Sequence, residues 1–373
     1  MKGVSADQPV ARGRPSRTVL TYWPGGTLEP VHLQKDPGGI PIAIAEEHHR
    51  SMLLVRTSRV PQIPNVEVIE ECGEGGPDMR RDLRRALAVL RNPEITDVLV
   101  IKGWKRQMLV TAIERLRHWG RPRPRWILKM DWGGPFSDRL TKYTTPPYLI
   151  LASWLYDQIV VETSCAEAIA RDWVVGPARL SMVPDGYSPH FHHPTGYRAT
   201  PRSPIVLSVC RIAPIKRLEI LIEAFAQATT DHPDWQLRLV GPTEDPDYRE
   251  RLQRLIDSLR LGKRVALVGE VDDVREEYTR ASVFCSTSER ESFGISRIEA
   301  MINGLPVITT PAGCPEDLKA MGMVVVPDVS VSTFVEALRK LVSDGSLRER
   351  LGEQGLQGVL SWNQIVRALV EPR

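Results

Sequence analysis

Two glutamates, Glu291 and Glu299, lie on either side of a glycine, Gly294, that precedes a predicted helix at Ile295–Asn303. The first turn of such a helix leaves backbone N–H groups free and carries the positive end of the helix dipole, so it favours an anionic ligand. The two carboxylates could then accept hydrogen bonds from hydroxyl groups of the same ligand. The simpler alternative is that both glutamates are solvated surface residues, which is the usual state of this residue type.

Two cations, Arg211 and Lys216, follow a predicted strand at Ile205–Cys210 and precede a predicted helix at Leu218–Ala228. Loops at the carboxyl ends of parallel strands are where ligands bind in open α/β sheets. A guanidinium and an ammonium group at this place suit the charge of a departing diphosphate. We expect Lys216 to be the more exposed of the two and Arg211 to be the better bidentate partner. A solvated pair of surface cations is the alternative.

Two further patterns could indicate a metal site but have simpler interpretations. Asp245 and Asp247 flank a proline and resemble a DxD metal motif, yet an aspartate followed by proline is typical of the start of a helix. His190, His192 and His193 form a histidine run without a neighbouring cysteine or carboxylate cluster, so we expect a solvated linker there. The sequence therefore predicts no metal site.

The cysteines are odd in number and widely spaced. They are Cys72, Cys165, Cys210, Cys285 and Cys314. No pair has the CxxC spacing, so the sequence predicts neither a disulfide framework nor a zinc ribbon, and it favours a reducing compartment. We expect Cys165 and Cys285 to be small core residues beside apolar strands rather than nucleophiles.

The composition is that of a soluble globular protein of 373 residues, with 42% hydrophobic and 25% charged residues and a net charge of +3. A charge this small argues against a dedicated nucleic-acid binder, which needs a strong basic excess. Residues 1–16 are polar and predict a disordered leader without the apolar run of a signal peptide. No apolar stretch reaches the length of about 18 residues that a transmembrane helix needs. We therefore expect a cytoplasmic protein.

Short apolar runs alternate with helical patterns along the chain, which is typical of βαβ units around a parallel sheet. In the first half, the predicted strands are Thr18–Trp23, Val66–Ile69, Asp97–Ile101, Arg125–Met130 and Gln158–Glu162, and the predicted helices are Ile40–Met52, Asp78–Leu90, Lys105–Trp119 and Tyr148–Trp154. In the second half, the strands are Ile205–Cys210, Gln236–Val240, Val265–Val268, Val283–Ser286, Val307–Thr309 and Val324–Val326, and the helices are Leu218–Ala228, Asp247–Leu259, Asp272–Arg280, Ile295–Asn303 and Ser332–Ser343. Leu109 and Leu116 are expected on the buried face of their helix. Right-handed crossovers then predict doubly wound α/β domains.

A segment rich in proline and glycine, Val183–Pro204, separates the two halves. Such a density of turn-forming residues cannot lie inside a sheet, so the segment is predicted to be a linker. Two domains joined in this way place the carboxyl ends of two sheets at a cleft, where ligands bind in this class of fold.

The segment from Glu291 to Ile308 resembles the signature of the retaining glycosyltransferases of family 4, which have the GT-B fold of two Rossmann-like domains facing each other across a cleft. The signature reads E-x-F-G-x-x-x-x-E-A-M-x-x-G-x-P-V-I, and the matching residues are Glu291, Phe293, Gly294, Glu299, Ala300, Met301, Gly304, Pro306, Val307 and Ile308. By this resemblance, Glu299 would hold the ribose hydroxyls of a sugar nucleotide and Glu291 the donor sugar. The donor sugar and diphosphate would lie against Ser292, Phe293, Gly294 and Ile295.

Other segments of the second half resemble the same family. Ser208, Arg211 and Lys216 reproduce its pattern S-x-x-R-x-x-x-x-K. The resemblance makes Arg211 and Lys216 the cations that neutralise the departing diphosphate. Val265–Val271 resembles the segment whose backbone recognises the nucleotide base, which places Val271 at the donor.

The first half resembles the family more weakly. Gly38 and Gly39 fit the glycine pair that opens the family's first helix and approaches a donor or acceptor phosphate, although paired glycines are common in loops. Many members carry a histidine after the strand that corresponds to Trp126–Met130, whereas this chain has Asp131 there. Asp131 could hydrogen-bond the donor sugar or the acceptor hydroxyl, or it could be a helix cap or turn residue.

The resemblance implies both a division of the chain and an activity. Residues 17–190 would bind the acceptor, residues 191–357 would bind the nucleotide sugar, and a C-terminal helix at about 358–373 would pack back on the first domain. The activity would be transfer of a hexose-type sugar from a UDP-, GDP- or ADP-sugar to a hydroxyl of a glycan, glycolipid or small molecule, with retention and without a metal or other cofactor.

Several alternatives stay open at this point. A sugar-nucleotide epimerase or a phosphorylase shares the architecture, and a catalytically silent partner subunit would keep the fold. The silent subunit is disfavoured because Arg211, Lys216, Glu291 and Glu299 are all present. Arginine-rich helix faces in the first half leave open a peripheral contact with the inner face of a membrane. No oligomeric state is predicted.

Overall fold

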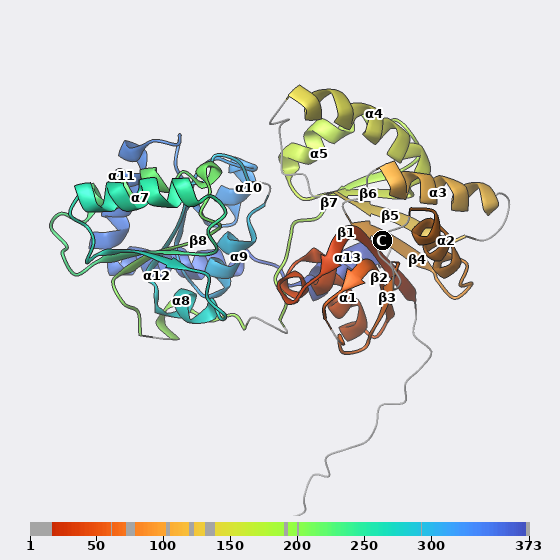
Figure 1. Ribbon diagram of the computed structural model, residues 1–373, viewed down its shortest axis with the longest axis horizontal. Helices are drawn as coiled ribbons and strands as arrows, with labels where there is room; N and C mark the ends of the chain where they lie inside the picture. The colour runs from red at the N-terminus through yellow and green to blue at the C-terminus, as the bar shows by residue number, and fades with distance from the viewer. Residues whose placement is uncertain are drawn as a thin grey trace, which may run out of the picture.

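The computed structural model describes residues 17–60, 62–71, 79–101, 105–118, 123–130, 139–189, 193–199, 201–291 and 293–370. Within these residues the chain forms two α/β domains, each built on one sheet (Figure 1). The first sheet has the strand order β3-β2-β1-β4-β5-β6-β7 and the second the order β10-β9-β8-β11-β12-β13. Neighbouring strands are parallel throughout both sheets. The predicted fold class of two doubly wound parallel-sheet domains is therefore confirmed.

The first domain covers its sheet with helices on both faces. Its strands are β1 (Thr18–Leu28), β2 (Arg50–Ser58), β3 (Val66–Glu70), β4 (Asp97–Ile101), β5 (Arg125–Lys129), β6 (Gln158–Val161) and β7 (Arg179–Met182). Its helices are the 3-10 turn η1 (Pro30–Gln34), α1 (Asp36–Glu46), α2 (Met79–Leu90), α3 (Lys105–Arg117), α4 (Arg139–Leu155) and α5 (Ser164–Arg171), with α13 (Trp362–Val370) from the end of the chain. Helices α1 and α13 share the core on one face, and α2 to α5 pack on the other (Figure 1).

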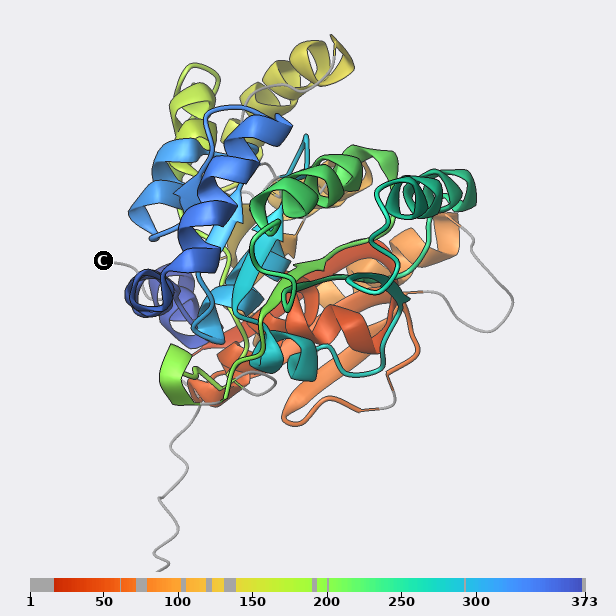
Figure 2. The ribbon, with the colours of Figure 1, turned by 90° about the vertical axis from the view of Figure 1, so that its left-hand side faces the viewer.

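The second domain has the same two-layer covering. Its strands are β8 (Ile205–Val209), β9 (Gln236–Val240), β10 (Val265–Gly269), β11 (Val283–Ser286), β12 (Val307–Thr309) and β13 (Val324–Val325). Its helices are η2 (Tyr197–Ala199), η3 (Pro214–Lys216), α6 (Leu218–Ala228), α7 (Pro246–Ser258), α8 (Arg275–Arg280), α9 (Ile295–Ile302), α10 (Pro315–Ala320), α11 (Val331–Ser343) and α12 (Gly345–Gln357). Helices α6, α7 and α11 share one core cluster and α8, α9 and α10 the other. Figure 2 looks at this domain from its free end, with the first domain behind it.

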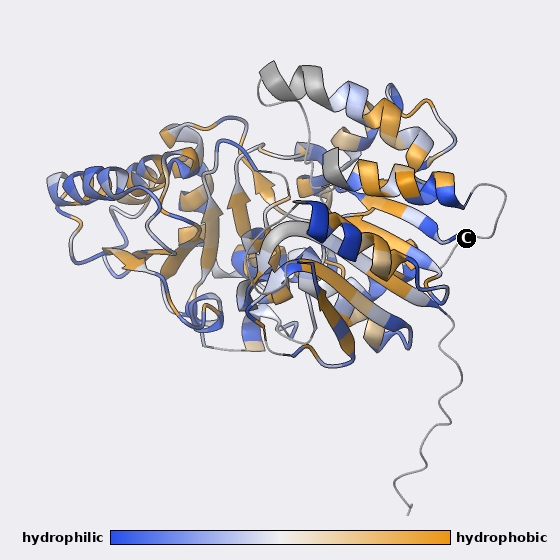
Figure 3. Ribbon diagram, turned by 45° about the vertical axis from the view of Figure 1, so that its right-hand side comes forward, coloured by the Kyte–Doolittle hydropathy of each residue, from blue (hydrophilic) through white to orange (hydrophobic). Residues whose placement is uncertain are grey.

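The buried strands explain why much of the second domain could be predicted from its sequence. All residues of β11 and β12 are buried. Short segments of Val, Ile, Phe and small residues suit strands that helices cover on both faces. Figure 3 shows the strands of both sheets as mainly hydrophobic, whereas the surface helix α7 is mainly hydrophilic. The predicted bounds of β9, β11, β12 and α6 agree with the structure.

Two segments of the chain connect the domains. The first consists of residues 183–189, which follow β7, and the second of residues 358–361, between α12 and α13; the two are bridged by Tyr187 and Ser361. Helix α13 then packs against α1, where Arg367 pairs with Glu47 at 2.7 Å and Asn363 donates to Glu46 at 2.9 Å. The end of the chain is thus fastened to the first domain.

The stretch from Asp36 to Ser58 differs from the prediction of one helix over Ile40–Met52. Helix α1 begins at Asp36, so the glycine pair lies in its first turns, and strand β2 already begins at Arg50. Both elements are apolar and buried, so hydrophobicity alone could not separate them. The break falls at His48, whose φ of 64° takes the backbone out of the helical region.

Helix α3 turns a different face to the core than we expected. Leu109 and Leu116 are 53% and 67% exposed, whereas Thr111 and Glu114 are buried. The Thr111 hydroxyl bonds to the hydroxyl of Tyr156 at 3.2 Å, so a hydrogen bond makes a polar buried face tolerable. The exposed leucines are not part of a spanning segment, because no helix in the described ranges combines the length and the apolar character needed to cross a bilayer.

Candidate functional site

The site is built from two loops at the carboxyl ends of neighbouring strands, β8 and β11, which pair in parallel. The backbone N–H of Glu289 donates to the carbonyl of Ile215 at 2.9 Å. The hydroxyl of Thr287 donates to the carbonyl of Lys216 at 2.7 Å. These bonds fasten the two loops to each other, so the side chains that they carry keep a fixed relation.

Lys216 and Glu291 meet between these loops. The Lys216 Nζ lies 2.8 Å from Glu291 Oε2, and the two side chains are only 13% and 23% exposed. Arg211 instead pairs with Glu244 in the loop after β9 and is 58% exposed. The expectation that Lys216 is the more exposed cation is therefore wrong. Lys216 is the last residue of the 3-10 turn η3, whereas Arg211 precedes this turn.

Gly294 allows the close approach of two side chains at the start of α9. Its φ is +86°, and a Cβ there would lie 3.1 Å from both Arg297 Cδ and Glu291 Cγ. Arg297 is fully buried and donates to the carbonyl of Ala312 at 3.0 Å, while its Nε and Nη2 have no hydrogen-bond partner within the described residues. Burial lowers the pKa of Arg297 to about 10, which the negative charge of Glu291 opposes. A buried cation with free donors thus lies beside Glu291.

Glu299 lies one turn further along α9 and receives a hydrogen bond from a residue that sequence analysis missed. The hydroxyl of Tyr278, on α8, donates to Glu299 Oε2 at 2.7 Å. Burial raises the pKa of Glu299, although the bond from Tyr278 and the positive charge of Lys35 oppose this. Lys35 precedes α1, so the first domain faces the site from the other side. Tyr278 lies on an ordinary charged helix, which offered no signal of this role.

The other residues predicted to bind the donor lie either beside α9, in α1, or outside the described residues. Phe293 is buried in the hydrophobic cluster against which Val271 packs, and Ile295 is the first residue of α9. Gly38 and Gly39 are buried in α1, where a Cβ would lie 2.4 Å from Leu33 Cα or 2.5 Å from Trp362 Nε1. The glycine pair therefore has a packing role of its own. Asp131 and Ser292 lie outside the described residues.

The two aspartates of the DxD-like pattern belong to a helix start, as the sequence predicted. The Asp245 side chain accepts a hydrogen bond from the N–H of Tyr248 at 2.8 Å and caps α7, and Asp247 lies in the first turn. His190 and His192 of the histidine run lie outside the described residues.

At the carboxyl edge of the first sheet a buried lysine gathers three carboxylates. Lys129 Nζ lies 3.0 Å from Asp36, 2.7 Å from Glu162 and 2.8 Å from Asp185. Burial lowers the pKa of Lys129, but the charges of Asp185, Asp36 and Glu162 together raise it well above its usual value. The three carboxylates are close enough together to hold a metal ion, and the ammonium group supplies the positive charge among them. The sequence signal that could have indicated this cluster is a lysine, Lys129, directly after the apolar run Trp126–Leu128.

Two cysteines overturn the expectation of unpaired thiols. Cys165, near the start of α5, and Cys314, which precedes α10, form a disulfide across 149 residues of sequence. The assignment of Cys165 as a core residue was therefore wrong, because tertiary contact between domains cannot be inferred from cysteine spacing. Cys285 is buried in β11 as expected, and Cys210 is also free. Burial raises the pKa of the Cys210 thiol to about 11, which makes it a poor nucleophile.

The fold, with the carboxyl edges of two parallel-sheet domains facing each other, defines the GT-B class, and one solved structure superposes on nearly the whole chain. Alr3699/HepE from Anabaena, in complex with UDP-glucose, aligns with a TM-score of 0.66 and 18% identity over 95% of this chain and 99% of its own. Residues 195–357 match the family model described as Glycosyl transferases group 1. This match lies in the second domain and covers less than half of the chain.

Two curated relatives match parts of the chain. The exopolysaccharide phosphotransferase SCO2592 of Streptomyces coelicolor is 29% identical over 252 residues, which are 62% of this chain and 25% of that protein. The lipopolysaccharide core biosynthesis glycosyltransferase LpsE of Rhizobium meliloti is 32% identical over 157 residues, which are 41% of this chain and 44% of that protein. The chain thus spans less than half of the length of either relative.

Proposed function

We propose that the protein is a retaining glycosyltransferase that moves a hexose-type sugar from a nucleotide diphosphate sugar to an acceptor hydroxyl. The observation that supports this most directly is the pair of Lys216 and Glu291, joined at 2.8 Å at the start of α9. A cation for the diphosphate and a carboxylate for sugar hydroxyls lie side by side there. The UDP-glucose bound to Alr3699/HepE makes a UDP-sugar the first donor to test.

The donor would change the partners of these side chains. Its diphosphate would replace Glu291 as the partner of Lys216 and draw Arg211 away from Glu244, because a phosphate carries more charge than a carboxylate. Glu291 would then accept hydrogen bonds from the donor sugar. Glu299 would accept them from the ribose, and the base would lie near Val271.

The reaction would proceed on one face of the sugar. As the bond between C1 and the β-phosphate oxygen breaks, negative charge grows on the phosphate, where Lys216, Arg211 and the first N–H groups of α9 stabilise it. The acceptor oxygen bonds to C1 on the same face, its proton passes to a β-phosphate oxygen, and the nucleoside diphosphate leaves. This scheme retains the configuration at C1 and requires neither a metal nor a protein base. Asp131 would position the sugar or the acceptor hydroxyl.

The first domain would receive the acceptor. Exposed apolar residues lie on its neighbouring helices α3 and α4, among them Leu109, Leu116, Leu151 and Trp154. Exposed apolar groups beside a cation such as Arg117 suit the headgroup region of a membrane. This surface of the first domain would therefore suit a peripheral contact with a membrane, and with it a glycolipid acceptor. Sedimentation with anionic vesicles tests the contact, and equal binding of a Leu116→Ser, Trp154→Ser double variant would reject it.

A donor screen tests the proposal. Thermal unfolding of the full chain is measured with UDP-, GDP- and ADP-sugars, since a ligand that binds the native state raises the midpoint. The stabilising donor is then incubated with acceptors, and the anomeric configuration of the product is read by NMR. Transfer with retention, release of the nucleoside diphosphate and activity in EDTA are expected.

Each part of the proposal can fail separately. Release of a nucleoside monophosphate would indicate transfer of a sugar phosphate, the kind of activity that the name of the Streptomyces relative describes. Loss of activity in EDTA would indicate a metal-dependent reaction. Absence of stabilisation by every sugar nucleotide would reject donor binding altogether.

A further inference from the structure

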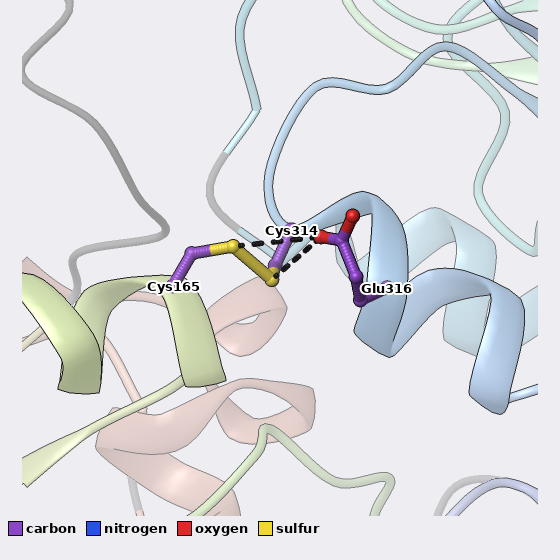
Figure 4. A group of neighbouring side chains, drawn as sticks. All are labelled: Cys165, Cys314 and Glu316. Carbon is purple, nitrogen blue, oxygen red and sulfur yellow. Dashed lines mark hydrogen bonds between the residues drawn. A yellow bond between two sulfur atoms is a disulfide. The ribbon is translucent and has the colours of Figure 1, made fainter.

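A disulfide joins the two domains directly. Cys165 is the second residue of α5 in the first domain, and Cys314 directly precedes α10 in the second, with their Cα atoms 5.6 Å apart. Figure 4 shows the side chain of Cys165 on α5 and that of Cys314 just before α10 joined by the disulfide, with Glu316 beside both sulfurs. The bond therefore adds a covalent connection between parts of the chain that belong to different cores.

Hydrogen bonds at the same junction hold the helices together without the disulfide. The hydroxyl of Ser164 donates to Asp317 Oδ1 at 2.6 Å, and its backbone N–H donates to Asp317 Oδ2 at 2.7 Å. Asp317 thus binds the start of α5 from the other domain. These contacts would keep two reduced thiols near each other, so the disulfide could open and close again without unfolding.

The junction lies away from the two segments that connect the domains. In Figure 1, α5 and α10 approach each other above the places where residues 183–189 and residues 358–361 pass between the domains. Two connecting segments on one side act as a hinge, about which the other side can open. A covalent bond at α5 and α10 holds that other side closed.

The cysteine in the second domain is also linked to the candidate donor site. Ala312, two residues before Cys314, accepts a hydrogen bond from Arg297 at 3.0 Å. Arg297 in turn packs over Gly294 and lies in the field of Glu291. Arg297 therefore connects the segment that carries Cys314 to the loop that would hold the donor.

We propose that Cys165 and Cys314 are a reversible redox site that controls the opening of the two domains. In the oxidised form the domains are held together, and a nucleotide exchanges slowly between the site and solvent. In the reduced form the hydrogen bonds of Asp317 open and close freely, and exchange is fast. The nucleotide part of this inference rests on the proposed function, whereas the domain movement does not.

The redox step needs an oxidant, and a low-molecular-weight disulfide such as oxidised glutathione suffices. The thiolate of Cys165, which is half-buried while Cys314 is buried, attacks one glutathione sulfur and releases the other as a thiolate. The Cys314 thiolate then attacks the Cys165 sulfur of this mixed disulfide and releases the second glutathione. Two protein thiols are oxidised and one glutathione disulfide is reduced to two thiols. Disulfides of this transient kind are the ones that occur in reducing compartments.

The test compares the reduced and the oxidised full chain. Intact mass and peptide mapping under non-reducing conditions identify the Cys165–Cys314 bond after treatment with oxidised glutathione. Small-angle X-ray scattering measures domain opening without any ligand, and stopped-flow fluorescence measures association and dissociation of UDP. We expect the oxidised protein to be more compact on average and to exchange UDP about tenfold more slowly in both directions.

Matched variants locate the effect. Cys165→Ser and Cys314→Ser should each abolish the difference between the two redox states, and both should behave like the reduced protein. The control Cys285→Ala, which removes a free thiol from β11, should keep the full difference. Because the comparison is a ratio within each variant, a modest loss of stability in one variant does not disturb it.

Each outcome decides between the claims. Equal scattering and equal UDP rates in both redox states, with the bond verified by mass, would overturn the redox control of opening. Failure of oxidised glutathione to form the bond would overturn it as well. Uptake of one Zn²⁺ by the reduced protein, lost in either serine variant, would make the sulfurs metal ligands with Glu316 and also overturn it. A redox-dependent scattering profile without any UDP binding would instead reject the proposed function and leave the domain control standing.

Discussion

The carboxyl edges of the two sheets carry similar residue types but differ in how their charges are used. At the edge of the first sheet, Lys129 lies at 2.7–3.0 Å from three carboxylates and is fully buried. At the edge of the second sheet, the ion pair of Lys216 and Glu291 keeps contact with solvent. Arg297 beside this pair has donors without a partner among the described residues.

This difference is the one we expect between a structural cluster and the proposed binding site. The ammonium group of Lys129 is surrounded by opposite charges, so it has no capacity left for a ligand. The pair of Lys216 and Glu291 can exchange each partner for a ligand group of the same charge, because water and ligand can reach it.

The largest effect is expected from the buried cluster. Lys129→Met should lower the free energy of unfolding by about 3–5 kcal/mol, because it leaves three buried carboxylates without their cation. Chemical unfolding of the full chain measures this. Lys340→Met, which removes a lysine from an exposed pair with Glu336, is the control and should change little. A Lys129 variant as stable as the parent protein would remove the distinction between the two edges.

The next effect concerns turnover rather than stability. Lys216→Ala should reduce kcat about 10²–10³-fold, because it removes one of the groups that we propose to stabilise the leaving diphosphate. Its unfolding midpoint should fall less than that of Lys129→Met, since Glu291 keeps a second cation, Arg297, beside it. Turnover is measured by release of nucleoside diphosphate, with Lys340→Ala as the control. Unchanged turnover in a folded Lys216→Ala protein would contradict the assignment.

A smaller effect, on UDP affinity, tests the role proposed for Glu299. Tyr278→Phe should weaken UDP binding about 5–10-fold, because a hydrogen bond that orients a charged acceptor is lost. The bond from Tyr278 favours the ionised carboxylate, so its removal raises the pKa of Glu299 further. As the pH falls, the variant should lose UDP affinity at a higher pH than the parent protein.

Calorimetric titrations from neutral to acidic pH measure this shift. In the parent protein the loss should begin above the range of an ordinary glutamate, because burial already raises the pKa of Glu299. Glu299→Gln should remove this pH dependence. A pH profile common to all three proteins would show that Glu299 is not the titrating group.

The smallest effect lies at the junction of the domains. Glu316 Oε2 lies 3.9 Å from the sulfur of Cys165 and 3.7 Å from that of Cys314. A carboxylate there opposes thiolate formation, so Glu316→Gln should accelerate closure of the disulfide by oxidised glutathione about 2–5-fold. Quenched mass analysis gives the rate, and Glu336→Gln is the matched control. A rate equal to or below that of the parent protein would contradict this reading of the carboxylate.

Much of the second domain could be predicted because the patterns that define its helices and strands lie within a few neighbouring residues. The bounds of α6, β9, β11 and β12 follow from short apolar runs and helical periodicity, and the Asp245 cap follows from one aspartate before a proline. The positions of Glu291, Gly294 and Glu299 around the start of α9 follow from the same local reasoning. The structure adds that Lys216 reaches Glu291, which lies 75 residues further along the chain.

The first domain was harder to predict, because the contacts that fix its helix faces and element bounds are polar or lie between residues distant in sequence. The face that α3 buries depends on the bond between Thr111 and Tyr156, and the break between α1 and β2 depends on the backbone at His48. In the second domain, Tyr278 and Arg297 could not be recognised as site residues for the same reason. Each lies on a helix whose hydrophobic pattern accounts for the residue without any role at a site.

The sequence by itself determined the alternation of strands and helices, the parallel sheets and the residue types at the loops after β8 and β11. These properties follow from propensity and hydrophobic periodicity, which act over a few residues. Only the tertiary structure decided which charges meet, that Lys129 is enclosed while Lys216 is not, and that Cys165 reaches Cys314 across 149 residues. The physical reason is that ion pairs, buried hydrogen bonds and disulfides depend on distances of a few ångströms between segments whose separation along the chain carries no such information.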